Sequence, residues 1–432
     1  MEAFTTYQTA REYLYSLKNS GSKYGIDRMR LLVEALGHPQ KRFPIIHIGG
    51  TNGKGSTCAM LESIFREAGY KTGMYTSPHL LDQCERIQVN RENLPKDKAL
   101  QYINQLLPVA EELAKDDPDN YPSFFEFMTA IAFMHFAEER VDIAMIEVGL
   151  GGRLDATNVV VPLVSAITSV SLDHCDILGD TISLIAGEKA GIIKPGVPIV
   201  VGRVPDDALR VINAKANELD SPVYCTKEST IGQAAELPEV SFKAAYNRYN
   251  AVTALTICNL LNERFAINRD VQIRGLQNFQ WDARWDSRQL EDRKTLILDA
   301  THNPEGVVEL DQSLQQLVEE LGYKPVIIAG TLGEARASSL MPVLARYGRE
   351  LHLLIPQQSR ACTYEQLEDA IPQDYRGIIH RSTVEKIFSG GLQCTVGNSG
   401  DTILATGSIY LMGEILEALY PHKAAAGALL QD

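Results

Sequence analysis

The sequence predicts an α/β protein with an N-terminal parallel-sheet domain of the phosphate-loop type and a smaller C-terminal Rossmann-like α/β domain. The first observation is the length of 432 residues, which exceeds the size at which single hydrophobic cores usually stop growing. The second is the alternation of short apolar segments with segments of helical periodicity. The third is a glycine-rich turn that joins the first apolar segment to a helix.

The first domain is predicted to contain a parallel sheet covered by helices on both faces, because alternation of strands and helices is typical of that arrangement. Two helices are expected to open the chain, at 7–18 and 26–36. The predicted strands that follow are 44–48, 71–76, 141–148, 162–168 and 197–202, and the predicted helices are 56–68, 97–114, 123–139, 181–190, 205–219 and 249–261.

The second domain is predicted to begin after a polar, irregular segment at 280–293. A new apolar strand starts at Thr295, so we place the domain junction near 284–290 and expect domains at 1–284 and 285–432. The predicted strands of the second domain are 295–299, 325–330, 350–355, 377–380 and 402–405, with helices between them.

The segment from Ile45 to Thr57 carries the clearest chemical signal. An apolar strand leads into a glycine-rich turn, which is followed by a helix. This geometry directs backbone N–H groups and a helix N-terminus towards a phosphate chain. A lysine adds positive charge, and two hydroxyls are suited to Mg²⁺. We therefore predict that ATP is held by Thr51, Asn52, Gly53, Lys54, Gly55, Ser56 and Thr57.

This loop departs from the general phosphate-loop pattern in two places. Gly55 separates Lys54 from Ser56, and the position six residues before the lysine is Ile48 rather than glycine. An ordinary strand-to-helix turn is therefore the alternative interpretation.

Glu147 is predicted to stand at the end of the strand 141–148, directly before a glycine-rich segment. Ligands of open parallel sheets gather at the carboxyl ends of the strands. A carboxylate beside a phosphate loop suits Mg²⁺, which prefers oxygen ligands. The alternative is a glutamate that caps a turn or forms a salt bridge.

Composition excludes several classes of function. The net charge is −14 and no lysine- or arginine-rich run is present, which argues against nucleic-acid binding. No apolar run reaches the length of a membrane span, and the N-terminus does not resemble a signal peptide. Seven scattered cysteines without a C-x-x-C pair argue against a disulfide framework or a cysteine zinc site, so we expect a cytoplasmic protein.

An acidic protein that binds ATP must concentrate positive charge locally. The candidates for this role are Lys54, Arg86, Arg153 and Arg288.

Eight short segments of the chain carry recognisable motifs. They are 51–56 (TNGKGS), 75–80 (YTSPHL), 85–87 (ERI), 124–127 (FFEF), 146–158 (IEVGLGGRLDATN), 172–174 (LDH), 187–194 (GEKAGIIK) and 299–304 (DATHNP). Together they resemble the folylpolyglutamate synthase and dihydrofolate synthase family, which belongs to the Mur-ligase superfamily of ATP-dependent amide-forming ligases. The resemblance extends over roughly residues 8–415, and the segments occur in the family's order.

The resemblance implies two Mg²⁺ sites. It makes Ser77, Glu147 and His174 metal ligands, and the hydroxyl of Ser56 joins them from the loop. It also implies that Lys189 is carbamylated by CO₂, which converts a cation into a carboxylate-like ligand. The alternatives are a surface pair of Glu188 with Lys189 and a lysine that contacts phosphate.

The resemblance assigns roles to four further residues. It places Asp299 and His302 across the interdomain cleft, near the ATP phosphates and the incoming amino acid; a turn-capping aspartate is the alternative. Arg288 is expected to reach the phosphates, although the family's Trp-Pro-Gly-Arg is Trp-Asp-Ser-Arg here. Asn250 is the expected adenine contact. The catalytic residues are then Lys54, Lys189, Asp299 and His302.

The implied reaction is amide formation through an acyl phosphate. A substrate carboxylate attacks ATP, and the amine of L-glutamate then attacks the acyl phosphate. The acceptor is a tetrahydrofolate, dihydropteroate, or both. Candidate acceptor-binding residues are Arg86, Phe124, Arg153 and Asp155, with Phe125 and the segment 77–86 beside them.

Two other functions stay open at this point. One is a Mur-type ligase that acts on a cell-wall precursor, although Gly55 after Lys54 favours the folate branch. The other is a non-catalytic nucleotide-binding protein. The family is mostly monomeric, so the resemblance implies a monomer.

Overall fold

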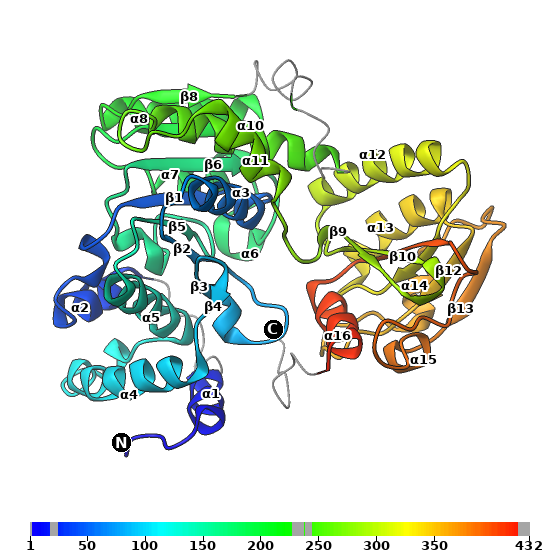
Figure 1. Cartoon of the computed structure of the whole chain (residues 1–432), viewed down its shortest axis with the longest axis horizontal. Coiled ribbons are helices and arrows are strands. Elements are labelled where there is room, and N and C mark those ends of the chain that lie inside the picture. Colours follow the sequence, from blue (N-terminus) through cyan, green and yellow to red (C-terminus); the bar gives the residue numbers. More distant parts are fainter. Residues whose placement is uncertain (1, 18–24, 227–236, 238–243, 422–432) are drawn as a thin grey trace. The chain divides into compact units, whose positions relative to one another are not determined.

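The computed structural model describes residues 2–17, 25–226, 237 and 244–421. It divides into two compact units, each described by itself below (Figure 1). The first unit extends to Phe279 and the second begins at Gln280. Two earlier segments also belong to the second unit, His79–Gln83 and the stretch that ends at Asn247.

The first unit is built on a sheet of eight strands, and the expected parallel arrangement is present from β2 to β8. Its central strands β1, β5 and β6 are buried along their whole length. The strands lie in the order β4 (Glu92–Asn93), β3 (Ile87–Val89), β2 (Thr72–Tyr75), β5 (Ile143–Glu147), β1 (Ile45–Gly49), β6 (Val164–Ser169), β7 (Ile199–Arg203) and β8 (Val223–Cys225).

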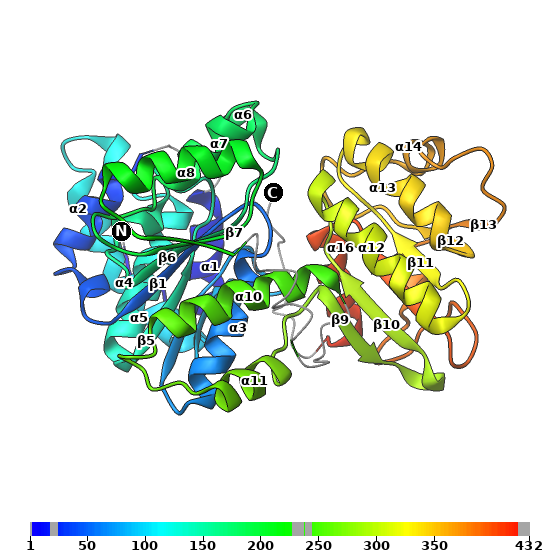
Figure 2. The same cartoon turned by 90° about the horizontal axis from the view of Figure 1, so that it is seen from above.

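Helices cover both faces of this sheet. Figure 2 shows α3, α10 and α11 on one side of β1, β6 and β7, with α7 and α8 on the other. The helices are α1 (Tyr7–Ser16), α2 (Asp27–Ala35), α3 (Lys54–Glu67), α4 (Lys96–Leu113), α5 (Phe124–Glu139), α6 (Cys175–Leu178), α7 (Ile182–Ala190), α8 (Asp206–Glu218), α10 (Ala245–Leu260) and α11 (Arg269–Gln277). None of the helices in the described part of the chain combines the length and apolarity that a membrane crossing requires.

The predicted strands of the first unit are confirmed to within two residues at their ends. The prediction missed the β3–β4 hairpin, which pairs antiparallel with β2 and forms one edge of the sheet. Asn90 and Arg91 form its turn with positive φ angles of 51° and 68°. Strands of three and two residues are too short to show an alternating pattern, so the sequence carries little signal for them.

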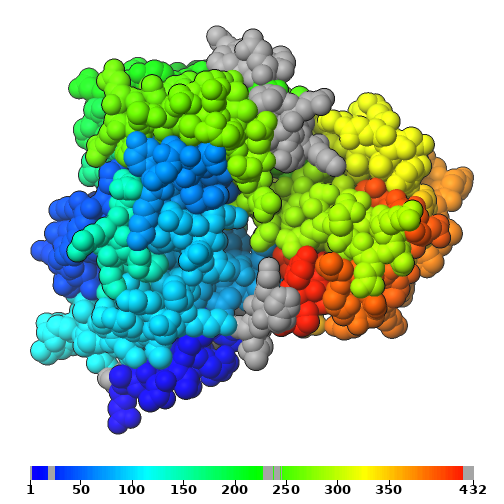
Figure 3. Space-filling model, viewed as in Figure 1, coloured from blue at the N-terminus to red at the C-terminus, as the bar shows by residue number. Residues whose placement is uncertain are grey.

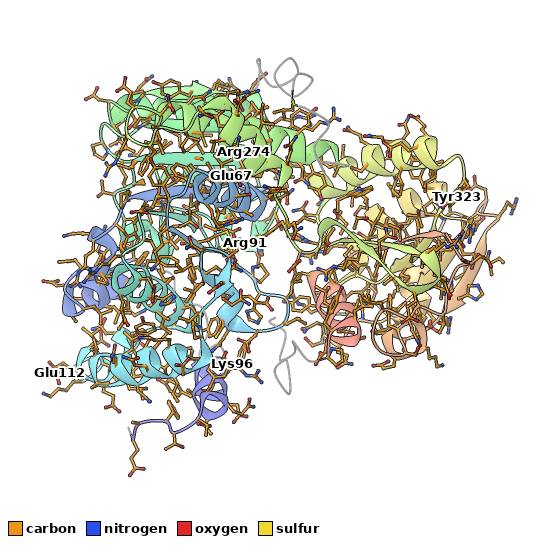
Figure 4. The ribbon with its side chains drawn as sticks, in the orientation of Figure 1. Glu67, Arg91, Lys96, Glu112, Arg274 and Tyr323 are labelled. Carbon is orange, nitrogen blue, oxygen red and sulfur yellow. The ribbon has the colours of Figure 1, made fainter. Side chains whose placement is uncertain are left out.

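Helix α11 was also missed, and it packs closely on the loop-bearing helix α3. A Cβ atom added at Gly275 would lie 2.5 Å from the Cα of Ile64, so the glycine permits this close approach. The hydroxyl of Ser63 donates a hydrogen bond of 2.6 Å to the carbonyl of Gly275. At the surface, Arg274 Nε donates to Glu67 Oε1 at 2.7 Å (Figure 4).

The second unit contains a six-stranded sheet that is parallel except for β9. Its order is β13 (Ile378–Arg381), β12 (Glu350–Leu353), β11 (Val326–Ala329), β14 (Thr402–Thr406), β10 (Thr295–Asp299) and β9 (Arg284–Gln289). Helices α12 (Pro304–Leu321) and α13 (Glu334–Tyr347) share an apolar core with one face, and α15 (Val384–Ile387) and α16 (Ile409–Leu419) with the other (Figure 1). Helix α14 (Tyr364–Asp369) precedes β13.

Strand β9 corrects the prediction of an irregular segment at 280–293. It pairs antiparallel with β10 at an edge of the sheet. Trp285 is buried while Asp286, Ser287, Arg288 and Gln289 are exposed or half-buried. An edge strand tolerates such a polar sequence because one side of it is not covered by another strand. Arg288 therefore lies on a strand rather than on a linker between domains.

Candidate active site

The glycine-rich loop connects β1 to α3, and helix α3 begins at Lys54, two residues earlier than predicted. Gly53 occupies the N-cap position with φ of 82°, and Gly50 has φ of 146°. Both conformations favour glycine. The first turn of α3 therefore presents its N-terminal N–H groups at the carboxyl end of β1, where a phosphate chain could accept them.

The loop is tied to the neighbouring strand β6 by hydroxyl groups that the sequence interpretation missed. Thr168 Oγ1 donates to the carbonyl of Asn52 at 2.6 Å, and the N–H of Asn52 donates to Ser169 Oγ at 3.0 Å. The N–H of Thr51 donates to the carbonyl of Ser169 at 2.9 Å. The signal was a run of hydroxyl residues at the end of a predicted strand, which resembles many surface turns.

Two lysines converge on the carbonyl oxygen of Gly50. Lys54 Nζ donates to it at 3.1 Å and Lys189 Nζ, from the last turn of α7, donates at 3.0 Å. Lys54 Nζ also donates to the carbonyl of Thr51 at 3.0 Å. Lys189 is buried, with 3% of its surface exposed. The structure thus brings together two of the predicted catalytic residues.

Glu147 ends strand β5 and is buried beside the loop. The N–H of Ser77 donates to Glu147 Oε2 at 3.0 Å, so two of the predicted metal ligands lie together. Burial and, second, the negative charge of Glu147 raise the pKa of Cys58 on α3 well above its usual value. The register of β5 with β1, in which Glu147 is the partner of Ile48, places the residue next to the strand end that leads into the loop.

The hydroxyls of Ser56 and Thr57 lie in the buried first turn of α3. Thr57 Oγ1 has no hydrogen-bond partner among the described residues. Together with Glu147 they form a set of hard oxygen donors, which fits Mg²⁺.

The described contacts of His174 and Arg153 are with residues other than the oxygen donors Ser56, Thr57 and Glu147. His174 has positive φ, its side chain is half-exposed, and its Nε2 lies 3.9 Å from Asp173 Oδ1. Arg153 is exposed and donates to Glu188 Oε1 from Nη2 at 2.7 Å and from Nε at 3.1 Å. Their predicted roles as metal ligand and substrate contact therefore stay predictions.

Asp155 belongs to a buried hydrogen-bond network. Its oxygens accept from the N–H of Leu150 at 2.9 Å and from the hydroxyl of Thr157 at 2.5 Å. Since that hydroxyl donates to Asp155, it accepts from His47 Nε2–H at 2.8 Å. Burial lowers the pKa of His47 to about 3, with a smaller contribution from Lys194. These contacts hold the loop after β5 in place, and the predicted role of Asp155 as a substrate contact stays a prediction.

Arg86 and Phe124, both predicted substrate residues, lie together. The Arg86 guanidinium carbon lies 5.4 Å from the centroid of the Phe124 ring, within the range of a cation–π contact. Arg86 is buried, and burial lowers its pKa while Tyr75 and Glu147 oppose that effect. Phe125 packs on Tyr75 with ring centroids 6.0 Å apart.

Asn250 on α10 lies against the loop. A Cβ atom added at Gly53 would lie 2.3 Å from Asn250 Oδ1, so this approach depends on glycine. The predicted adenine contact is thus next to the predicted phosphate site.

In the second unit, Asp299 at the end of β10 is buried and accepts four hydrogen bonds from the described residues. Its Oδ2 accepts from the Tyr246 hydroxyl at 2.7 Å and from the N–H of Trp285 at 3.0 Å. Its Oδ1 accepts from the hydroxyl and the N–H of Thr301 at 2.5 and 3.1 Å. The aspartate therefore fixes the turns around it, and its predicted role near the ATP phosphates stays a prediction.

His302 and Arg288 also lie in the second unit. His302 Nδ1–H donates to the carbonyl of Ala300 at 2.8 Å, so in the neutral ring Nε2 is the nitrogen that carries no hydrogen. Arg288 Nη2 donates to Asp286 at 2.7 Å and to Asp282 at 2.8 Å, and its guanidinium lies 5.2 Å from the ring centroid of Tyr420. Burial acts to lower the pKa of Arg288, but the carboxylates of Asp286 and Asp282 outweigh it and raise the pKa above its usual value. A phosphate would have to replace one of these partners.

Comparison with known proteins identifies relatives over nearly the whole chain. The Mur ligase middle domain matches residues 48–237. A dihydrofolate synthase/folylpolyglutamate synthase of Bacillus subtilis is 34% identical, and the alignment covers 96% of this chain and 100% of that protein.

Solved structures that resemble this chain include proteins of the same family. A folylpolyglutamate synthase of Thermotoga maritima superimposes with a TM-score of 0.82 at 30% identity, covering 97% of this chain and 98% of that one. A bifunctional folylpolyglutamate synthase/dihydrofolate synthase of Yersinia pestis, complexed with AMPPNP and a Mn ion, gives 0.79 at 27% identity and covers 97% and 99%. With the loop, the paired lysines and Glu147 in place, the chain belongs to the folylpolyglutamate synthase/dihydrofolate synthase family of Mur ligases.

Proposed function

We propose that this protein is an ATP-dependent ligase that joins L-glutamate to a folate, to dihydropteroate, or to both. The observation that carries the proposal is the convergence of Lys54 and Lys189 on the carbonyl of Gly50 in a phosphate-type loop, with Glu147 buried beside it. The Bacillus subtilis relative, which is aligned over its full length, is named for both activities.

The loop from Thr51 to Thr57 binds the phosphates of ATP in this proposal. The relative from Yersinia pestis was solved with an ATP analogue and a Mn ion, which supports ATP and a divalent cation as ligands here. Ser56, Ser77 and Glu147 would hold the cation. When bound, the cation supplies positive charge that neutralises the phosphate oxygens.

The loop residues contribute positioning and charge to the first step. A carboxylate oxygen of the acceptor attacks the γ-phosphorus of ATP, the bond to ADP breaks, and an acyl phosphate forms. Lys54 exchanges its loop carbonyls for phosphate oxygens and stabilises the negative charge that spreads over the transferred group. The N–H groups of the first turn of α3 act in the same direction.

The second step forms the amide. The neutral α-amine of L-glutamate attacks the acyl carbon, phosphate leaves, and the amine loses its proton to water or to a base. His302 is our candidate for that base, because Nδ1–H is committed to the carbonyl of Ala300 and Nε2 is then the basic nitrogen. Asp299 is assigned a positioning role for the segment that carries His302.

The remaining site residues are assigned to binding. Asn250, which contacts the loop at Gly53, is proposed to bind the adenine. Arg86 and Phe124 form a cation–π pair suited to an aromatic, anionic acceptor such as a folate. Arg288 is proposed for the phosphates, after exchange of one carboxylate partner.

Lys189 is proposed to be carbamylated. Its neutral amine attacks the carbon of CO₂, an N–C bond forms, and the proton released from nitrogen goes to water, leaving an anionic carbamate. Two ammonium groups that share one acceptor repel each other, whereas a carbamate at Lys189 would attract Lys54. The carbamate oxygens would also add to the oxygen ligands for the cation.

The test is phosphate release from Mg-ATP and L-glutamate, with dihydropteroate and tetrahydrofolate supplied in separate assays. Turnover with tetrahydrofolate alone identifies a folylpolyglutamate synthase, with dihydropteroate alone a dihydrofolate synthase, and with both a bifunctional enzyme. The proposal is overturned if the protein binds ATP but releases no phosphate in a glutamate-dependent way with dihydropteroate or with tetrahydrofolate.

A further inference from the structure

A cluster of three metal-ligating side chains lies in the second unit, outside the proposed active site. Glu350 and His352 share one face of β12, two residues apart, and His380 stands beside His352 in the register of the edge strand β13. Their ligand atoms all lie within 4.8 Å of one another. Among the described residues, this is the group in which three histidine, cysteine or carboxylate side chains lie close enough to share a metal ion.

The distances are close to those of a bound metal. Oε2 of Glu350 lies 3.6 Å from His352 Nε2 and 3.9 Å from His380 Nε2. Around a tetrahedral Zn²⁺, with bonds of about 2.0–2.2 Å, neighbouring ligand atoms are roughly 3.3 Å apart. The imidazole rings are stacked, with centroids 4.5 Å apart and planes inclined by 16°, so a shared ion would require them to tilt towards each other.

His352 provides an independent indication of a ligand. Its side chain is more than nine-tenths buried, yet Nε2 has no hydrogen-bond partner among the described residues. Leaving a buried polar nitrogen without a partner costs free energy. Burial and, second, the neighbouring His380 lower the pKa of His352, while the nearby carboxylate of Glu350 opposes that shift.

The second oxygen of Glu350 is held by a neighbouring cation. Arg349 Nε donates to Glu350 Oε1 at 3.3 Å, and the same guanidinium is paired with Asp401. This contact directs Oε2 towards the two histidines. Orientation of a ligating carboxylate by a second hydrogen bond is common in metal sites.

We propose that Glu350, His352 and His380 bind a divalent transition-metal ion of the Zn²⁺ type. Two imidazoles and one carboxylate suit Zn²⁺ better than Mg²⁺, which prefers oxygen ligands. The half-exposed side chain of His380 leaves a position for water as a fourth ligand. The ion would cross-link β12 to β13, an edge strand whose four residues are all exposed. The orange part of the second unit, the colour range to which β13 belongs, lies at the surface in Figure 3.

The experiment is a calorimetric titration of the full chain with Zn²⁺, in the presence of saturating Mg²⁺ and AMPPNP, which occupy the proposed nucleotide site. The variant is His380→Gln, because this side chain is half-exposed and its loss should not disturb the fold. The matched control is Glu365→Gln, which removes a carboxylate paired with the adjacent Arg381 and outside the cluster.

We expect the wild-type chain to bind one Zn²⁺ ion. His380→Gln should lower the affinity for this ion by at least about tenfold, and Glu365→Gln should leave the affinity unchanged. Zn²⁺ should raise the melting temperature of the wild type but not of His380→Gln, while both melt alike in EDTA. Equal Zn²⁺ affinity in wild type and His380→Gln overturns the proposal. So does a wild type that binds no Zn²⁺ under these conditions. Neither result bears on ligase activity, which is assayed separately with Mg²⁺.

Discussion

Lys54 and Lys189 are 135 positions apart in the sequence, yet both donate hydrogen bonds to one and the same atom, the carbonyl oxygen of Gly50. The arrangement places two side chains of like charge at one end of the phosphate loop. Such a pair is costly unless an anion lies between the charges or one charge is removed. Bound ATP would place an anion between the two charges, and carbamylation of Lys189 would remove one of them.

Replacement of Lys189 by alanine tests whether this residue acts as a carbamate or as a cation. We expect Lys189→Ala to lower kcat by about 10²-fold or more, because the variant loses transition-state charge stabilisation. If the active form is a carbamate, acetate should restore part of the activity and ethylammonium should not. Rescue by ethylammonium alone would show that Lys189 acts as a cation, and ¹³CO₂ labelling of the wild type provides an independent readout.

Replacement of Glu147 by glutamine removes the charge of the carboxylate but keeps an oxygen that can accept from the N–H of Ser77. The fold should therefore persist, while kcat falls by about 10²-fold and the Mg²⁺ concentration for half-maximal activity rises. Steady-state assays across a range of Mg²⁺ concentrations measure both effects. The control is Glu112→Gln, an exposed residue on α4 paired only with Lys115 among the described contacts. An unchanged Mg²⁺ requirement in Glu147→Gln would argue against a metal role.

Gly50 is predicted to be intolerant of any side chain. A Cβ atom there would lie 2.0 Å from Thr168 Oγ1, and φ of 146° is unfavourable for other residues. Gly50→Ala should therefore abolish detectable AMPPNP binding and lower stability by about 1–3 kcal/mol. Gly187→Ala is the comparison, since nothing lies within 4 Å of its added Cβ in α7 and it should be neutral or mildly stabilising. Similar AMPPNP affinity in both variants would contradict the loop geometry.

Adjacent positions of α11 are predicted to differ in their contribution to stability. Gly275→Ala forces a Cβ against the backbone of Ile64 and should cost about 1–3 kcal/mol in the free energy of unfolding. Arg274→Ala removes only the surface pair with Glu67 and should cost about 0.2–1 kcal/mol. Urea denaturation of the two variants and the wild type gives both values. Equal costs would mean that α11 does not pack tightly on α3.

The stability of the first unit is predicted to depend on the ionisation of His47. Burial lowers its pKa to about 3, whereas the unfolded chain has the ordinary value of about 6.5. Between these values the unfolded state binds more protons, so this contribution is complete above pH 6.5 and is lost as the pH falls towards 3. In His47→Asn the slope of unfolding free energy against pH should be smaller in that window. Denaturation curves at pH 4.5, 5.5 and 7 measure it, and identical slopes would contradict the prediction.

The strands and the loop were predictable because each is a local pattern. Apolar runs of strand length gave all of the central strands, and the spacing of glycines, lysine and hydroxyls gave the loop. The β3–β4 hairpin was missed because its strands are too short to show a period. Strand β9 was missed because a polar edge strand resembles a loop.

Contacts between distant residues could not be predicted. Thr168 and Ser169 hold Asn52 across more than a hundred positions, and that contact follows from the pairing of β1 with β6 rather than from any local pattern. The same limit applies to His352 and His380, which only the register of two parallel strands brings together. The network from His47 through Thr157 to Asp155 is also a product of tertiary structure.

The attachment of the glycine-rich loop to β6 has a consequence for local unfolding. Most surface loops open in small fluctuations that leave the rest of the domain intact. Here the amides of Thr51 and Asn52 are donated to Ser169 at the end of a fully buried central strand. Their hydrogen exchange should therefore be as slow as that of the sheet. Because these bonds must break when the loop opens, the end of β6 holds the loop in its observed shape without a bound ligand.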